Sequence, residues 1–274
     1  MKNFGLIGYP ISHSLSPYLF RAAYNGKYPY DLIEEEDFDT AYGRFIAEYD
    51  AINVTAPFKE KACRKADIRS QECEITGAAN ILIKREDGKI EAANSDVTGV
   101  IGAIASAGHT QGTSTRALIV GCGGAAMAAA YTTCSLGYET VILNRNLRKA
   151  QDFAKRLSQV SGFKVSAGDL NSFRREFRKA GVIVYTLPLA IPALADLTGI
   201  DLKGGLFRSE RKVILEANYR DPALTPDLME KWQKTNPELT FISGKEWLLH
   251  QAIGAYSLFT DEEPNIKSMQ TTIE

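Results

Sequence analysis

The chain has 274 residues, of which 45% are hydrophobic and 24% are charged, so it is long enough for two domains with cores of their own. Its formal net charge of −1 provides no global field that would favour nucleic acid or an anionic membrane surface. It contains no apolar run of about 18 residues, and because an apolar strand is predicted from Phe4 we expect no secretory leader. We therefore expect a cytoplasmic protein that binds neither membranes nor nucleic acids.

Cysteine and histidine show no metal-binding pattern. The four cysteines lack C-x-x-C spacing, and the three histidines lack paired spacing. His13 stands between serines before a predicted helix, which favours a turn residue over a base. We predict no metal site and no disulfide framework.

The N-terminal part of the chain alternates predicted strands and helices. Strands are predicted at residues 4–7, 30–33 and 51–54, helices at 18–24, 37–49 and 97–107, and a hairpin at 80–84 with 90–93. Alternation of this kind is typical of an α/β fold with a mainly parallel sheet. Ligands of such sheets lie beyond the carboxyl ends of the strands.

Polar residues follow several of these predicted strands. Ser14 and Ser16 precede a helix, where two hydroxyls and the positive helix end suit one carboxylate; alternatively, Ser16 only caps the helix before Pro17. Lys59 follows the strand at residues 51–54 and so lies where a ligand is expected; alternatively, it is a surface lysine within a charged run. Asp96 follows the second strand of the hairpin and is a second candidate for a ligand contact; alternatively, it is only the N-cap of the next helix.

Residues 116–146 contain the most informative stretch of the chain. An apolar strand at 117–120 leads into Gly121-Cys122-Gly123-Gly124, and a helix rich in small residues begins at Ala125 and ends at Gly137. Such glycines let backbone N–H groups approach a ligand, and the helix start favours an anion. The stretch predicts a binding site for the pyrophosphate of a dinucleotide.

The next strand, at residues 139–143, specifies the kind of dinucleotide. An NAD site usually carries Asp or Glu about 20 residues after the first glycine. Here Asn144, 23 positions after Gly121, is followed by Arg145, Asn146, Arg148 and Lys149. Guanidinium groups suit a 2′-phosphate, so we predict NADP(H) rather than NAD(H). The alternative is a solvated basic helix start.

The rest of the chain repeats the alternation. Helices are predicted at 150–157, 173–179, 224–234 and 247–259, and strands at 163–165, 182–185, 213–215 and 240–242. Thr186 follows a strand on the nicotinamide side, and Gln251 is the polar exception in the apolar stripe of the last helix. A polar joint at residues 108–115 separates the two halves.

Taken together, these motifs resemble the shikimate dehydrogenase (shikimate/quinate dehydrogenase) family over nearly the whole chain. The matching stretches are Gly8-Tyr9-Pro10, residues 12–17, Asn53-Val54-Thr55-Ala56-Pro57-Phe58-Lys59, Gly77-Ala78-Ala79-Asn80, Asn94-Ser95-Asp96, residues 121–125, Asn144-Arg145, and Gly244 with Gln251. The resemblance implies a substrate domain at residues 1–107 with 245–274, to which the C-terminal helices return. It also implies a Rossmann-type NADP-binding domain at residues 108–244.

The family likeness also implies roles for individual residues. Lys59 and Asp96 are the implied catalytic pair of a reversible, NADP-dependent reduction of 3-dehydroshikimate to shikimate. Ser14 and Ser16 are implied to bind the substrate carboxylate. The implied contacts to ring hydroxyls are Thr55, Asn80, Asp96, Tyr219 and Gln251. The implied NADP residues are Gly121, Cys122, Gly123, Gly124, Ala125, Asn144, Arg145, Asn146, Arg148, Lys149, Thr186, Ala217 and Gly244.

Several positions depart from the family pattern. Asn146 replaces a threonine, Lys149 takes the place of a later arginine, and Glu216 replaces an aspartate ahead of Tyr219. Tyr185-Thr186-Leu187 also differs from the usual stretch after its strand. Two alternatives stay open: an NAD-using quinate/shikimate dehydrogenase and a non-catalytic NADP-binding regulator on the same fold. We expect a monomer or a homodimer.

Overall fold

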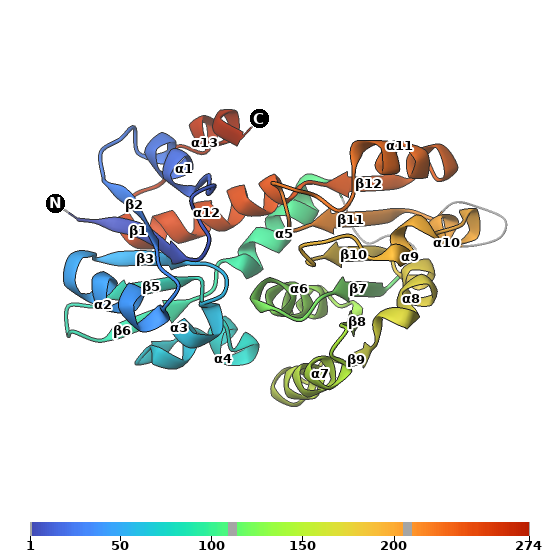
Figure 1. The fold of residues 1–274 in the computed structure, drawn as a ribbon, viewed down its shortest axis with the longest axis horizontal. Helices are drawn as coiled ribbons and strands as arrows, with labels where there is room; N and C mark the ends of the chain where they lie inside the picture. The colour runs from blue at the N-terminus through green and yellow to red at the C-terminus, as the bar shows by residue number, and fades with distance from the viewer. Residues whose placement is uncertain (1, 109–113, 205–209, 274) are drawn as a thin grey trace. The chain divides into compact units, whose positions relative to one another are not determined.

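The computed structural model describes residues 2–108, 114–204 and 210–273. The chain forms two compact units, unit 1 (Met1–Gly99 with Leu248–Glu274) and unit 2 (Val100–Trp247) (Figure 1). The boundaries of the units fall within two helices, α5 (Asp96–Ser106) and α12 (Gly244–Thr260). The domain division placed after residues 107 and 244 stays a prediction, and residues 109–113 of the proposed joint lie outside the described residues.

Unit 1 is built on a mixed sheet with the strand order β2-β1-β3-β5-β6-β4. Its remaining elements are β1 (Phe4–Gly8), α1 (Ser16–Ala23), β2 (Tyr30–Glu34), α2 (Phe38–Glu48), β3 (Ala51–Val54), α3 (Lys59–Lys65), β4 (Ile68–Arg69), α4 (Gln71–Thr76), β5 (Ile81–Lys84), β6 (Ile90–Ala93) and α13 (Ile266–Ile273). β1 pairs in parallel with β2 and β3, and β4 pairs in parallel with β6. β5 is antiparallel to both neighbours, which confirms the predicted hairpin.

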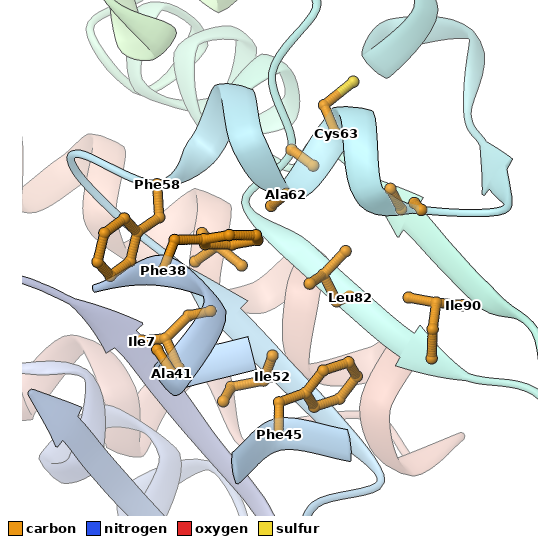
Figure 2. Packing of buried hydrophobic residues seen from close by; sticks show 14 of the residues in the cluster. Ile7, Phe38, Ala41, Phe45, Ile52, Phe58, Ala62, Cys63, Leu82 and Ile90 are labelled. Atoms are coloured by element: carbon orange, nitrogen blue, oxygen red, sulfur yellow. The ribbon is translucent and has the colours of Figure 1, made fainter. Parts of the chain in front are cut away.

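Helices cover both faces of the central strands of unit 1 because alternate residues point to opposite sides of a sheet. On one face, Phe38 and Phe45 of α2 and Phe58 beside α3 pack over Ile7 and Ile52 (Figure 2). The opposite face carries an aromatic cluster that joins the first strand to the C-terminal helices. In that cluster the ring of Phe4 lies 5.3 Å from the rings of both Phe20 and Phe259. α13 packs against α1 in the same unit.

Unit 2 contains an entirely parallel sheet with the order β12-β11-β10-β7-β8-β9. Its elements are β7 (Arg116–Val120), α6 (Gly124–Ser135), β8 (Glu139–Leu143), α7 (Leu147–Ser161), β9 (Val165–Gly168), a 3₁₀ turn (Leu170–Ser172), α8 (Phe173–Lys179), β10 (Val182–Tyr185), α9 (Pro192–Ala195), α10 (Gly199–Lys203), β11 (Lys212–Glu216), α11 (Pro226–Thr235) and β12 (Leu239–Ile242). Counted from β7, this is the order 3-2-1-4-5-6 of the Rossmann fold. The predicted fold class is confirmed.

One buried lysine holds the C-terminal end of α8 to the sheet of unit 2. Lys212, at the start of β11, is fully buried, and its Nζ donates hydrogen bonds to the carbonyl oxygens of Phe177 (3.1 Å), Arg178 (2.9 Å) and Ala180 (2.6 Å). The last carbonyls of a helix lack intrahelical donors, so the amine caps the helix end together with the Ala180 N–H, which also donates to the Phe177 carbonyl oxygen (3.3 Å). Burial lowers the pKa of Lys212 to about 8.

Several short helices were not predicted from the sequence. They are α3, α4, α9, α10 and α13, none longer than eight residues. α1 begins at Ser16 rather than at Tyr18, because Ser14 Oγ accepts the Ser16 N–H (3.2 Å) and Leu15 is the N-cap. Among the residues with described positions, we find no helix of the length and apolar character that a membrane crossing requires.

Candidate active site

The candidate catalytic pair lies in unit 1, where two helices begin. Lys59 is the first residue of α3 and Asp96 the first of α5, and Lys59 Nζ lies 2.6 Å from Asp96 Oδ2. The two side chains are 16% and 5% exposed, so Lys59 is not a surface lysine. Asp96 stands inside the helix rather than at the N-cap position, and its carboxylate binds the lysine. A half-buried ammonium with hydrogens beyond those used by one carboxylate can donate to a ligand oxygen.

The backbone around this pair is tied to one neighbouring segment. The Ala79 N–H donates to the carbonyl oxygen of Lys59 (2.9 Å), and the Asp96 N–H donates to Asn94 Oδ1 (3.1 Å). Asn94 Nδ2 in turn donates to the carbonyl oxygen of Ala78 (2.9 Å). The segment before β5 therefore fixes the positions of both charged residues.

Asn80 and Gln251, which are 171 positions apart in the sequence, meet in the same unit. Asn80 Nδ2 donates to Gln251 Oε1 (2.9 Å) and to Ser95 Oγ (3.0 Å), and Asn80 Oδ1 accepts the Ser95 N–H (2.8 Å). Asn80 is 2% exposed, whereas Gln251 is half-buried. Because Ser95 precedes Asp96, this contact also connects the amide pair to the charged pair.

The two predicted carboxylate-binding serines also lie together. Ser14 Oγ donates to Ser16 Oγ (3.1 Å) and accepts the Ser16 N–H (3.2 Å). The alternative that Ser16 caps the helix is wrong, because Ser16 is the first helical residue and Leu15 is the N-cap. Both hydroxyls thus stand at the N-terminal end of α1, where partial positive charge favours an anion.

Sequence reasoning missed the residues that support these groups. Tyr30 donates from its hydroxyl to Asn53 Oδ1 (2.8 Å), and Asn53 Nδ2 donates to the Asn80 carbonyl oxygen (3.3 Å). The Ser16 hydroxyl neighbours the Tyr30 phenol, whose pKa is raised well above 10.0 mainly by burial. Tyr256 donates to the carbonyl oxygen of Ser16 (3.1 Å). The one available signal was the polar Asn53 within the apolar strand 51–54.

Thr55 follows β3 directly and lies beside Gly8. Its N–H donates to the carbonyl oxygen of Ile7 (2.9 Å). A Cβ at Gly8 would stand 2.4 Å from Thr55 Cγ2, so the approach of the two chain segments requires a glycine there. The half-buried Thr55 thus lies at the carboxyl end of the strand, four residues before Lys59.

In unit 2, neighbouring parallel strands bring the predicted cofactor residues to one edge of the sheet. Gly121, Thr186 and Ala217 follow β7, β10 and β11, and Gly244 comes two residues after β12. Gly121 has φ +120°, and a Cβ there would stand 2.2 Å from Thr186 Oγ1. A Cβ at Gly244 would stand 2.5 Å from the Ala217 carbonyl oxygen. Only glycine allows the backbone this approach.

The glycine turn opens α6 as the motif requires. Gly123 is the N-cap and Gly124 the first residue of α6, and nothing lies within 4 Å of a Cβ built at Gly123. The helix start therefore faces open space, with backbone N–H groups that have no intrahelical acceptor. Cys122 and Ala125 complete the turn, and Cys122 Sγ contacts the Lys149 carbonyl oxygen (3.8 Å). This cradle fits the pyrophosphate of a dinucleotide.

The basic segment after β8 lies next to this turn. Asn146 caps α7 by accepting the Lys149 N–H (3.1 Å), and Asn144 Nδ2 donates to the Asn146 carbonyl oxygen (3.2 Å). Arg145, Arg148 and Lys149 are exposed. The first turn of α7 contains no acidic residue, and cations there oppose the helix dipole. A bound phosphate would offset this unfavourable arrangement, so the segment fits a 2′-phosphate.

Tyr219, the remaining predicted substrate residue, lies in unit 2. It is half-buried on the loop between β11 and α11. The preceding Asn218 shapes this loop, because its Oδ1 accepts the N–H groups of Arg220 and Asp221 (3.2 Å each). Tyr219 is thus held by the cofactor-side unit rather than by unit 1.

Comparisons with known proteins agree with this geometry. The family model described as the shikimate dehydrogenase substrate binding domain matches residues 6–82. The shikimate dehydrogenase (NADP(+)) of Carboxydothermus hydrogenoformans is 30% identical over 281 residues, covering 98% of this chain and 95% of that protein. The Methanopyrus kandleri enzyme of the same name is 29% identical, with 98% and 93% covered.

Solved structures show the same likeness over the whole chain. The crystal structure of Mycobacterium tuberculosis shikimate dehydrogenase has a TM-score of 0.80 and 28% identity, covering 100% of this chain and 98% of that one. The shikimate 5-dehydrogenase of Thermus thermophilus in complex with shikimate has a TM-score of 0.80 and 26% identity, with the same coverage. On the strength of the full-length relatives, this chain belongs to the shikimate dehydrogenase family.

Proposed function

We propose that this protein catalyses the reversible, NADP-dependent reduction of 3-dehydroshikimate to shikimate. The observation that carries the proposal is the pair formed by the half-buried Lys59 and the buried Asp96, whose Nζ and Oδ2 atoms are 2.6 Å apart. It lies in the unit matched by the substrate-binding family model and is connected through Ser95 to Asn80 and Gln251. A regulator that only binds NADP has no use for a half-buried ammonium beside a cluster of hydroxyl-binding side chains.

The nicotinamide cofactor supplies the hydride, so the side chains of unit 1 have to manage one proton. Lys59, as an ammonium ion, donates a hydrogen bond to the C3 carbonyl oxygen and delivers the proton as that oxygen gains negative charge. Asp96 orients the lysine through its 2.6 Å contact and accepts from a substrate hydroxyl. In the reverse direction the same nitrogen takes the proton back.

The polar residues around the pair select the substrate. Ser14 and Ser16 donate to the substrate carboxylate at the start of α1, where the helix dipole also favours it. Thr55, Asn80, Tyr219 and Gln251 contact ring hydroxyls. Both hydrogens of Asn80 Nδ2 already have acceptors, so Gln251 Nε2 is the amide donor of that pair that reaches the ligand.

Unit 2 holds NADP(H) by its glycine turn and its basic segment. The N–H groups of residues 121–125 bind the pyrophosphate, and Arg145, Arg148 and Lys149 bind the 2′-phosphate with Asn144 and Asn146 beside them. Thr186, Ala217 and Gly244 stand at the carboxyl ends of neighbouring strands and line the nicotinamide half. The residues at this edge favour NADP over NAD because no carboxylate follows β8.

Steady-state rates with shikimate and quinate, each against NADP⁺ and NAD⁺, test the proposal. We expect shikimate with NADP⁺ to give the highest kcat/KM. Turnover of quinate with NAD⁺ as the best pair would instead identify a quinate/shikimate dehydrogenase. NADP binding without turnover of either substrate would identify a regulator.

A further inference from the structure

A buried carboxylate closes the loop that carries Tyr219. Glu216, the last residue of β11, is 4% exposed. Its Oε1 accepts the Ala223 N–H (2.6 Å) and its Oε2 accepts the Leu224 N–H (2.9 Å). Each oxygen therefore binds one backbone group at the far end of the loop, and the carboxylate connects the two ends of the segment from 217 to 224.

The same loop is fixed at its near end and in its middle. The Ala217 N–H donates to the carbonyl oxygen of Tyr185 (2.8 Å), and Asn218 Nδ2 donates to the Asp221 carbonyl oxygen (2.6 Å). Tyr219 lies between these anchors and the two bonds of Glu216. With the backbone held on both sides, the direction of the Tyr219 side chain depends on all three anchors.

The carboxylate also borders the space next to the predicted cofactor residues. Glu216, Tyr219 and Gly244 line one cavity of about 200 Å³ within unit 2. Burial raises the pKa of Glu216, while the two N–H donors act in the opposite direction. A buried carboxylate is costly unless its oxygens are bonded, so a role in fixing the loop accounts for an acid at this position.

We propose that Glu216 is a positioning residue for the proposed reaction, acting through the loop that presents Tyr219 to the substrate. This inference rests on the proposed function. The positioning role requires a carboxylate at residue 216, because the two backbone N–H groups of Ala223 and Leu224 need two acceptor oxygens. A glutamine offers one oxygen and turns an NH₂ group toward the second N–H.

A double-mutant cycle tests the inference. Glu216→Gln, Tyr219→Phe and the double variant are compared with the wild type by kcat and KM for shikimate at saturating NADP⁺. We expect Glu216→Gln to lower kcat/KM by at least about tenfold in the wild type, because a small misplacement of a contact is costly. In the Tyr219→Phe background the same change should have less than about a twofold effect.

Glu176 provides a matched control in the same unit. It is also buried, with 6% exposure, but it binds Arg116 and Arg175 rather than a loop. Glu176→Gln should lower the thermal midpoint while leaving kcat/KM within about twofold of the wild type. If Glu216→Gln does not fold, Glu216→Asp, which shortens the side chain by one methylene group and so moves the carboxylate away from the two N–H groups, takes its place in the cycle.

Equal effects of the Glu216 change in both backgrounds, or wild-type kcat/KM in Glu216→Gln, would overturn the inference. A silent Tyr219→Phe would overturn it as well, because no contact would then need positioning. Failure of the proposed function looks different: the wild type itself would not oxidise shikimate.

Discussion

The two units hold their functional groups in contrasting ways. In unit 1, Asn80, Ser95 and Gln251 bond to one another, and Lys59 bonds to Asp96, so the side chains are fixed before any ligand arrives. In unit 2, the glycine turn offers backbone N–H groups and α7 begins with exposed cations. A small, hydroxylated substrate needs precise directional partners, whereas a dinucleotide presents phosphates that a shaped backbone and exposed charges can bind.

The largest expected effect is the loss of the half-buried amine. Lys59→Ala should lower kcat by at least about 100-fold, because positioned proton transfer contributes on this scale. NADPH binding, measured by fluorescence titration, should persist, because the proposed cofactor residues lie in unit 2. Lys61→Ala, an exposed position on the same helix, serves as the control. Turnover near the wild-type value would remove Lys59 from catalysis.

A clash in the glycine turn should affect the cofactor alone. Gly121→Ala places a Cβ 2.2 Å from Thr186 Oγ1 at φ +120°, so we expect the KM for NADPH to rise by roughly ten- to 100-fold. Gly162→Ala is the control: this glycine also has a positive φ, but a Cβ there meets no atom within 4 Å. Comparing the two variants separates the effect of backbone strain from that of the clash. Substrate affinity, measured by calorimetry, should stay constant. A matching loss of shikimate binding would contradict the separation of the two roles.

A smaller change should alter cofactor preference. Arg145→Gln removes a guanidinium from the predicted 2′-phosphate site, and charge-assisted hydrogen bonds are worth about 1.5–3 kcal/mol. We expect the KM for NADP⁺ to rise by roughly tenfold or more while the KM for NAD⁺ is unchanged. Lys155→Gln, an exposed cation farther along α7, controls for net charge. Equal changes for both cofactors would place the 2′-phosphate elsewhere.

The smallest effect on turnover is expected at Lys212, which stands at the start of β11, at the opposite end of the strand from Glu216, and whose buried charge costs the folded protein stability. Burial lowers the pKa of Lys212 to about 8 in the folded protein, whereas an unfolded chain has the ordinary lysine pKa of 10.5. Between these values the unfolded state binds more protons, so the free energy of unfolding rises with pH, by up to roughly 3 kcal/mol. Urea unfolding of the wild type and Lys212→Met from pH 7 to 10 measures this difference. If the free energies of unfolding of the wild type and Lys212→Met differed by the same amount at every pH, the prediction would be wrong.

Most strands of both units could be predicted from the sequence, because they are apolar and end at glycines or polar residues. In unit 1, β3 and β6 fall at their predicted bounds, whereas in unit 2 the strand predicted at residues 163–165 is β9 at Val165–Gly168. β8 and β10 fall at their predicted bounds, and Gly121 through Lys149 carry a motif whose meaning is local. The short α3 escaped prediction because its seven residues, KEKACRK, are mostly charged and have no apolar stripe. It forms because Ala62 and Cys63 pack into the core of unit 1.

The supporting residues of the candidate site could not be predicted from spacing. Tyr30 and Asn53 belong to different strands, and Ser16 and Tyr256 lie 240 positions apart. Contacts of this kind depend on strand order and helix packing, which a local pattern does not contain. The resemblance to a family supplied the substrate-binding roles of Thr55 and Gln251, but not the hydrogen bonds around them.

The position of Gln251 on α12 has a consequence for biosynthesis. A ribosome makes the sheet of unit 1 first, yet the amide partner of Asn80 and the phenol that binds Ser16 emerge only after all of unit 2 has been translated. A nascent or truncated chain that ends before residue 248 therefore lacks part of the proposed substrate pocket, however well its first strands have paired. If the proposed site is the substrate site, competence for shikimate is acquired at the end of synthesis, when both ends of the polypeptide come together.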